Sequence, residues 1–191
     1  QFLSFKMNIL FIIALTFPVA VTSTAFSKID NEQLTINNEY AIGRKLIYAL
    51  ILALGQGVMY VLGSLLGGTF MHLLEKLSHW IVLALCFSIS FRMLLDTLKI
   101  RNGDNLYFVQ STKHLLLLSI ALGINSFIAG LMTEFYEPFQ NITPYLLAGC
   151  AFVWSIISMI IPFSKLRLTL NSLLNSISAG VILVKGLLLL I

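Results

Sequence analysis

Charged side chains are scarce in this chain: Asp, Glu, Lys and Arg make up 10% of its 191 residues, whereas about 25% is usual for a soluble domain. Apolar residues make up 58%, and the mean hydropathy is +0.93. This composition excludes an ordinary soluble domain and predicts an integral membrane protein whose main partner is the lipid bilayer. The surplus of 12 basic over 8 acidic residues does not require nucleic acid as a partner, because basic residues in short loops orient membrane proteins.

Cysteine is almost absent as well. The chain has two, Cys86 and Cys150, both in apolar runs, and neither belongs to a CxxC pair or to a Cys/His group with zinc spacing. The sequence also lacks a glycine-rich phosphate loop, a GxSxG nucleophile motif and a dinucleotide-binding fingerprint. We therefore expect no enzyme and no resident cofactor, and we expect both thiols to pack among apolar side chains.

Six apolar segments, each near the length that spans a bilayer, account for most of the chain. They predict an all-α membrane protein with six transmembrane helices in a single domain over residues 1–191. The first segment could also describe a signal peptide, but we expect a retained helix because it is long enough to span. The six predicted helices cover Met7–Phe26, Gly43–Phe70, His79–Leu98, His114–Thr133, Pro144–Phe163 and Leu173–Ile191.

Basic residues are distributed unevenly between the two ends of these helices. The first, third and fifth connections with their flanks carry eight Lys and Arg residues, whereas the opposite end carries two, Lys6 and Lys76. By the positive-inside rule, this asymmetry predicts cytoplasmic odd-numbered connections and two termini on the outer side. Trp80 and Tyr145 are then expected at the outer interface.

A weak internal repeat divides the chain into halves of about residues 7–99 and 113–191. Ile-Ala-Leu at 13–15 recurs at 120–122, and Ser-Ile-Ser at 88–90 recurs at 176–178. Because each half holds an odd number of helices, the two copies must cross in opposite directions, as in inverted-repeat transporters. We therefore predict two inverted three-helix repeats, with Pro18 of the first helix corresponding to Asn125 of the fourth.

The third segment carries an arginine and, four residues later, an aspartate. Arg92 and Asp96 share a helical face at this spacing and can pair. A charged side chain near the bilayer centre is costly, so it usually faces a partner, the bundle interior or a water-filled cavity. The pair therefore marks either an ion pathway or a tie between helices. A further alternative places Asp96 at the headgroup level.

Uncharged polar residues inside the segments form a second set of candidates. Pro18 leaves a carbonyl of the first helix without its usual donor, and Gly123 and Asn125 weaken the corresponding place of the fourth helix. Interrupted helices at matching places in two repeats indicate a substrate site near the midplane. The alternative is that the hydroxyls and amides only bond backbone carbonyls within the bundle. The candidate pathway residues are Pro18, Gln56, Ser88, Asn125 and Ser126, beside Arg92 and Asp96.

Other polar and small residues predict local features. His72, Glu75 and His79 would share a face if the chain were helical throughout, and they could then hold a transition metal; solvated interfacial groups are the alternative. Glu134 and Glu137 make the outer end of the fourth segment acidic; this end could gather cations electrostatically, but we expect a solvated loop. Close helix packing is expected at small residues four apart, which are Gly63 and Gly67 in the second segment and Ser172, Ser176 and Gly180 in the sixth.

The order and spacing of several motifs resemble one known family. In chain order these motifs are Gly43-Arg44, Gly55-Gln56, Gly63 with Gly67, His79-Trp80-Ile81, Arg92-Met93-x-x-Asp96 and Ala121-x-x-x-Asn125-x-x-x-x-Gly130. Together they resemble the bacterial manganese efflux pump family (MntP), within the lysine-exporter-like group, over nearly the whole chain. The resemblance implies six helices in two inverted halves and export of Mn²⁺ across the bacterial inner membrane, with periplasmic termini.

The chain departs from that family where metal-binding carboxylates are expected. The family carries an aspartate in helices one and four and commonly a glutamate in helix two; the matching positions here are Pro18, Asn125 and Gln56. Only Arg92 and Asp96 keep the family's charged character. Mn²⁺ prefers oxygen ligands, and desolvating it without compensating negative charge is costly. The resemblance implies a cation exporter working by alternating access, or a descendant without transport that serves as an assembly subunit among membrane-protein partners.

Overall fold

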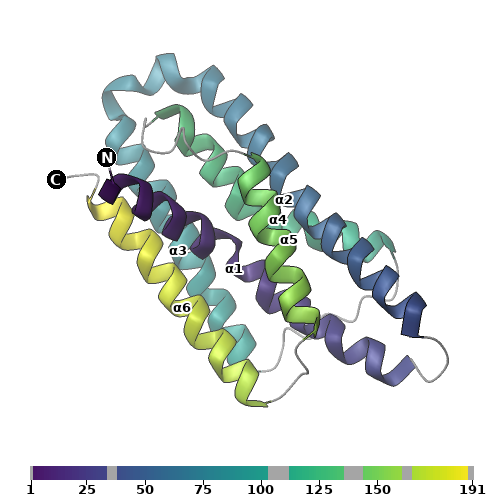
Figure 1. Cartoon of the computed structure of the whole chain (residues 1–191). Helices are drawn as coiled ribbons and strands as arrows, with labels where there is room; N and C mark the ends of the chain where they lie inside the picture. Colours follow the sequence, from purple (N-terminus) through teal and green to yellow (C-terminus); the bar gives the residue numbers. More distant parts are fainter. Residues whose placement is uncertain (1, 34–37, 103–111, 136–143, 161–164, 189–191) are drawn as a thin grey trace.

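A computed structural model describes the backbone of residues 2–33, 38–102, 112–135, 144–160 and 165–188 (Figure 1). Every element in these ranges is helical, which confirms the predicted all-α class. The side chains are described over 9–24, 43–70, 76–98, 113–135, 144–160 and 169–188. The elements are α1 (Phe2–Gln33), α2 (Asn38–Leu74), a 3₁₀ turn η1 (Glu75–Leu77), α3 (Ser78–Asn102), α4 (Thr112–Phe135), α5 (Pro144–Ile160) and α6 (Lys165–Leu188).

The helices have the length and composition of membrane spans. Within the described residues, α2, α3, α4 and α6 each contain a stretch long and apolar enough to cross a bilayer, and α1 and α5 contain shorter apolar stretches. Large apolar side chains lie on the outside of the bundle: Leu65, Leu117 and Ile160 are 65%, 65% and 71% exposed. Such a surface suits lipid rather than water. The protein is a multipass membrane protein.

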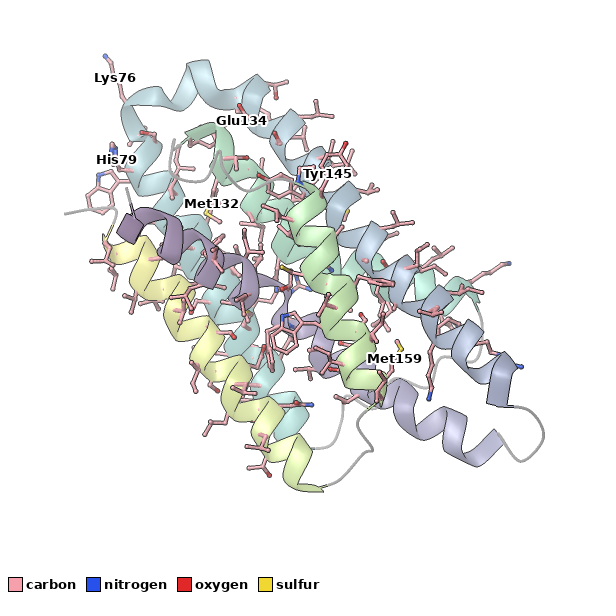
Figure 2. All side chains as sticks on the ribbon, viewed as in Figure 1. Lys76, His79, Met132, Glu134, Tyr145 and Met159 are labelled. Carbon is pink, nitrogen blue, oxygen red and sulfur yellow. The ribbon has the colours of Figure 1, made fainter. Side chains whose placement is uncertain are left out.

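The bundle alternates direction, with the start of α1 and the end of α6 at the same end (Figure 1). The Lys185 ammonium of α6 lies 4.9 Å from the centre of the Phe11 ring of α1, which fixes these two helix ends beside each other. Lys76, His79 and Tyr145 lie at this end as well (Figure 2). The start of α1 and the end of α6 therefore lie at the same end of the bundle, as predicted. The side of the membrane on which that end lies stays a prediction.

The main helix pairs are α2 with α4, α1 with α5, α3 with α6, and α2 with α5. Exchanging the halves, so that α1 replaces α4, α2 replaces α5 and α3 replaces α6, converts the α2–α4 pair into the α5–α1 pair and leaves the other two pairs unchanged. An inverted repeat predicts this pattern of pairs. The repeat itself stays a prediction.

Glycines bring α2 and α4 into backbone contact. A Cβ at Gly63 would overlap the Phe127 carbonyl oxygen, and one at Gly67 would lie 2.9 Å from the Leu131 carbonyl oxygen. From the other side, a Cβ at Gly130 would overlap the Tyr60 carbonyl oxygen. The expected close packing at the two α2 glycines is thus confirmed, and we call this contact the glycine seam.

The corresponding prediction for α6 is wrong at Gly180. This glycine is exposed, and no atom lies within 4 Å of the place where its Cβ would stand. The neighbouring Ser176 donates its hydroxyl to the Ser172 carbonyl of its own helix. Ser172 and Ser176 are half-buried, so the spacing of small residues fails to mark a close helix contact at Gly180, where the helix surface is open.

Candidate functional site

Three helices contribute to a buried group of polar side chains that we call the polar cluster. It consists of Gln56 on α2, Arg92 on α3, and Asn125 and Ser126 on α4. Gln56 and Ser126 are 0% exposed and Asn125 is 2% exposed, whereas Arg92 is half-buried. The structure thus places four of the seven predicted pathway residues in two hydrogen-bonded pairs, Arg92 with Asn125 and Gln56 with Ser126, and the adjacent positions of Asn125 and Ser126 on α4 join the pairs.

A side-chain hydrogen bond joins α2 to α4 within the polar cluster. The Ser126 hydroxyl donates to the Gln56 Oε1 atom, while the Gln56 Nε2 atom is buried without a hydrogen-bond partner. A buried donor left in this way costs about 1–3 kcal/mol, so the amide group marks a place where a further acceptor, such as a water oxygen, would stabilise the bundle. Turning the amide over would pair Nε2 with the serine and leave Oε1, an acceptor, facing the same place.

The α3 side of the cluster is held by the guanidinium group. Arg92 Nη1 donates to Asn125 Oδ1 at 3.0 Å, and Arg92 Nη2 donates to the Ala121 carbonyl oxygen at 2.5 Å. Ala121 and Asn125 are one turn apart on α4, so their oxygen atoms lie on one face and match the forked geometry of arginine. The Arg92 guanidinium therefore binds Asn125 Oδ1 and the Ala121 carbonyl oxygen, the two atoms that could coordinate a cation at Asn125.

The remaining predicted pathway residues lie outside these contacts. Ser88 is one turn before Arg92 on α3, is exposed, and donates its hydroxyl to the Ala84 carbonyl at 2.8 Å. Asp96 is one turn after Arg92 and half-buried, and its pairing with Arg92 stays a prediction. Pro18 is buried in α1, which continues as a helix through it. The carbonyl of Pro18 accepts a hydrogen bond of 3.0 Å from the Thr22 hydroxyl.

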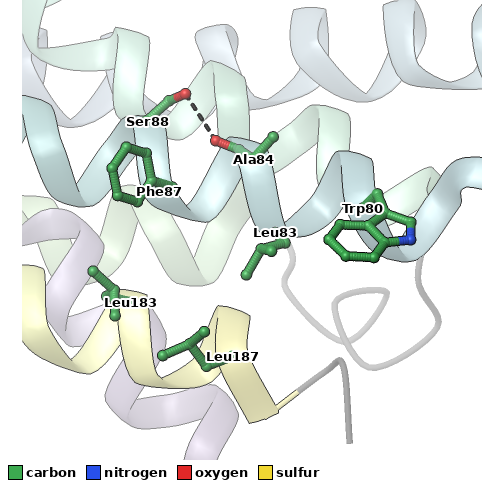
Figure 3. A pocket seen from close by; sticks show the side chains of 7 residues that line it. All are labelled: Trp80, Leu83, Ala84, Phe87, Ser88, Leu183 and Leu187. Atoms are coloured by element: carbon green, nitrogen blue, oxygen red, sulfur yellow. Dashed lines mark hydrogen bonds between the residues drawn. The ribbon is translucent and has the colours of Figure 1, made fainter.

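Ser88 also belongs to an apolar groove between α3 and α6 (Figure 3). The groove has a volume of about 500 Å³, and its walls include Trp80, Phe87, Leu183 and Leu187. The hydroxyl of Ser88 is occupied by its own helix, as the dashed line in the figure shows. The groove therefore offers apolar surface and no polar ligand.

The structure does not have the continuous helix on which the predicted metal site at His72, Glu75 and His79 depended. The site required one continuous helix through these residues, but α2 ends at Leu74 and the 3₁₀ turn η1 intervenes before α3. The side chains of His72 and Glu75 lie outside the described residues. His79 is exposed, and its Nδ1 atom lies 3.4 Å from the Ser78 hydroxyl. Among described side chains, no group of three His, Cys, Asp or Glu could hold a metal.

The expectation of a solvated loop at Glu134 is wrong. Glu134 lies in the last turn of α4, is half-buried, and its Oε1 atom accepts a hydrogen bond of 2.8 Å from the Ser64 hydroxyl of α2. Together with the bond from Ser126 to Gln56, this is a second polar tie between α2 and α4 with the same separation of 70 residues. A third bond, from the Ser119 hydroxyl to the Ile51 carbonyl, joins residues 68 apart. Nearly equal separations along the contact mean that the two helices run parallel.

Sequence reasoning missed a polar contact between α3 and α6. Asn175 Nδ2 donates to the Met93 carbonyl at 2.8 Å and to the Thr97 hydroxyl at 2.9 Å. The Asn175 Oδ1 atom and the Asn171 Nδ2 atom are buried without hydrogen-bond partners. The available signal was Asn175 inside the predicted sixth span, with Asn171 one turn before it and just outside that span. Lys185, a cation inside the sixth apolar segment, was another; it is 4% exposed.

Comparison with known proteins identifies the family. A family model described as “Putative manganese efflux pump” matches residues 39–190. The chain belongs to this family, MntP. A protein of Bacteroides thetaiotaomicron with the same description and the name MntP is 28% identical over 118 residues, which are 60% of this chain and 61% of that protein. The chain therefore aligns with about three fifths of the length of that relative. No solved structure matches the chain.

Membership in the MntP family confirms the resemblance seen in the motifs. The matched residues 39–190 contain α2 to α6 almost completely. They include all four residues of the polar cluster, whereas Pro18 lies before them. The family assignment thus rests on the same part of the chain that builds the polar cluster.

Proposed function

We propose that this protein exports manganese, or a similar hard divalent cation, across a bacterial inner membrane. The observation that carries this proposal is the MntP family match over residues 39–190, a stretch that contains the polar cluster. The name of the Bacteroides relative refers to the same activity. Both termini are then periplasmic, as the distribution of basic residues predicts.

The polar cluster offers oxygen ligands of the kind that Mn²⁺ takes. The Asn125 amide oxygen, the Ser126 hydroxyl and the Ala121 carbonyl are all neutral oxygens, which suit a hard cation but do not neutralise its charge. A cation that keeps part of its water shell needs less compensation from the protein. We therefore propose transport of a partly hydrated ion by alternating access around the cluster, with Asp96 as the nearby negative charge on α3.

The proposal is tested by transport from reconstituted vesicles. Proteoliposomes loaded with Mn²⁺ should lose it faster than protein-free vesicles, and a bacterial strain lacking its own exporter should gain manganese resistance when it expresses the chain. No flux above protein-free vesicles, under conditions in which the Bacteroides relative is active, would contradict the proposal. Co-purification of an inactive chain with other membrane proteins would then favour the assembly-subunit alternative.

A matched pair of serine variants locates the pathway. Ser126→Ala removes the hydroxyl that bonds Gln56 in the polar cluster, and we expect slower Mn²⁺ export with normal amounts of folded protein. Ser176→Ala removes a hydroxyl that bonds only its own helix among the described contacts, and export should be unchanged. Equal export by both variants would place the pathway elsewhere.

A further inference from the structure

The polar cluster already contains a cation, and it belongs to the protein. The Arg92 guanidinium occupies the Asn125 amide oxygen at 3.0 Å and the Ala121 carbonyl oxygen at 2.5 Å. Two oxygens one turn apart on one face of α4, at the buried Asn125 and the exposed Ala121, are ligands of the kind that a transported cation would seek. The cluster is therefore arranged as a cation site whose present occupant is tethered to α3.

We propose that Arg92 is an internal competitor of the transported cation: the guanidinium seals the site at Asn125 and must leave these oxygens before a divalent ion can bind. This inference rests on the proposed function and identifies the residue that sets the affinity of its site. Like charges so close in a medium of low dielectric repel strongly. Arg92 and a divalent cation therefore exclude each other at Asn125.

The contacts of Arg92 also connect occupancy to helix position. Both described hydrogen bonds of Arg92 run from α3 to α4. Release of the guanidinium therefore loosens the α3–α4 contact. The glycine seam holds α4 to α2 independently of Arg92. Entry of a cation thus removes these two hydrogen bonds between α3 and α4, while departure of the cation lets Arg92 form them again; the apolar contact of Cys86 with Met132 remains in both states.

The unpartnered amide of Gln56 supports a site that admits a further ligand. Its Nε2 atom is buried and has no hydrogen-bond partner, and the same side chain bonds Ser126, the neighbour of Asn125 in sequence. A water carried by the incoming cation supplies either a donor or an acceptor to this amide. The polar cluster thus has an unsatisfied donor at Gln56 among the described residues while Arg92 occupies the Asn125 oxygen.

Removal of the guanidinium should strengthen cation binding. Arg92→Ala and Arg92→Gln lose the competing charge, and we expect each to bind Mn²⁺ at least about tenfold more tightly than the wild type, within the usual 5- to 150-fold range of coupling between two sites. Arg92→Lys keeps the charge and should stay weak. Arg44→Ala, at an exposed arginine near the start of α2, is the matched control. Binding is measured in detergent from the loss of the EPR signal of free Mn²⁺.

Chemical rescue separates this proposal from a simple structural role. Methylguanidinium at millimolar concentration should occupy the space left in Arg92→Ala, return its Mn²⁺ affinity toward the wild-type value and raise its thermal stability, whereas sodium should do neither. Unchanged Mn²⁺ affinity in both neutral variants, or no competition by methylguanidinium, would overturn the competitor role. If wild-type vesicles still export Mn²⁺ in that case, the proposed function stands without it. If neither the wild type nor the variants bind Mn²⁺, both ideas are wrong.

Discussion

Gly130→Ala is expected to disrupt the glycine seam between α2 and α4. The new Cβ would overlap the Tyr60 carbonyl oxygen and lie 2.9 Å from the Ser64 amide nitrogen. Both are backbone atoms, so no side chain can turn away, and the two helices must separate. Separation also weakens the bonds that cross the seam, from Ser126 to Gln56, from Ser64 to Glu134, and from Ser119 to the Ile51 carbonyl.

The magnitude follows from two costs and one gain. Overpacking of a tight contact costs about 1–3 kcal/mol, and three strained hydrogen bonds between membrane helices add about 2 kcal/mol at roughly 0.6 kcal/mol each. Alanine returns about 0.5–1 kcal/mol relative to glycine within a helix. The free energy of unfolding should therefore fall by about 2–4.5 kcal/mol if all three bonds weaken, and by at most about 2.5 kcal/mol if none does.

The control is a glycine-to-alanine change in open space. Gly149 in α5 and Gly180 in α6 have no atom within 4 Å of the place where a Cβ would stand, so Gly149→Ala and Gly180→Ala should be neutral or slightly stabilising. Unfolding of all variants is followed by circular dichroism in mixed micelles with increasing SDS. Equal stability of Gly130→Ala and the two controls would refute the argument that backbone contact at the seam stabilises the bundle.

Two further substitutions probe the other buried polar groups. Asn175→Ala should lower the free energy of unfolding by about 1–2 kcal/mol, because two hydrogen bonds to α3 are lost at about 0.6 kcal/mol each and a small cavity remains. Unfolding in SDS measures this change. A loss of stability no larger than that of Ser176→Ala would contradict the prediction. Gln56→Leu should change the free energy of unfolding by no more than about 1 kcal/mol, because it removes an unpartnered buried donor together with a hydrogen bond. The same substitution should abolish Mn²⁺ export from vesicles. Retained export would show that the amide has no role in the pathway.

The fold was largely predictable because lipid imposes a simple rule on the sequence. Apolar stretches of spanning length identified all six helices, but not their ends. The sixth was predicted from Leu173, whereas α6 begins at Lys165. Hydropathy detects the part of a helix that lies in hydrocarbon, and the first two turns of α6 contain Lys165, Arg167 and Thr169, which a helix outside the hydrocarbon tolerates well.

The members of the polar cluster were predictable, but their partners were not. Gln56, Arg92 and Asn125 stood out because polar side chains are costly inside a span. The sequence suggested Asp96 as the partner of Arg92 from their spacing within one helix. That pairing stays a prediction, and the described bonds of Arg92 reach Asn125 and Ala121 on α4, which depends on the crossing and register of two separate helices. No pattern within a single helix contains that information.

The separation of 68 to 70 residues between bonded partners on α2 and α4 has a consequence for assembly. The tightest helix contact joins the first half of the polypeptide to the second, so neither half contains a complete bundle. A gene split between Asn102 and Thr112 should yield two fragments that are degraded when made separately and that recover a functional complex when made together. Each half would then act as the template on which the other acquires its final shape.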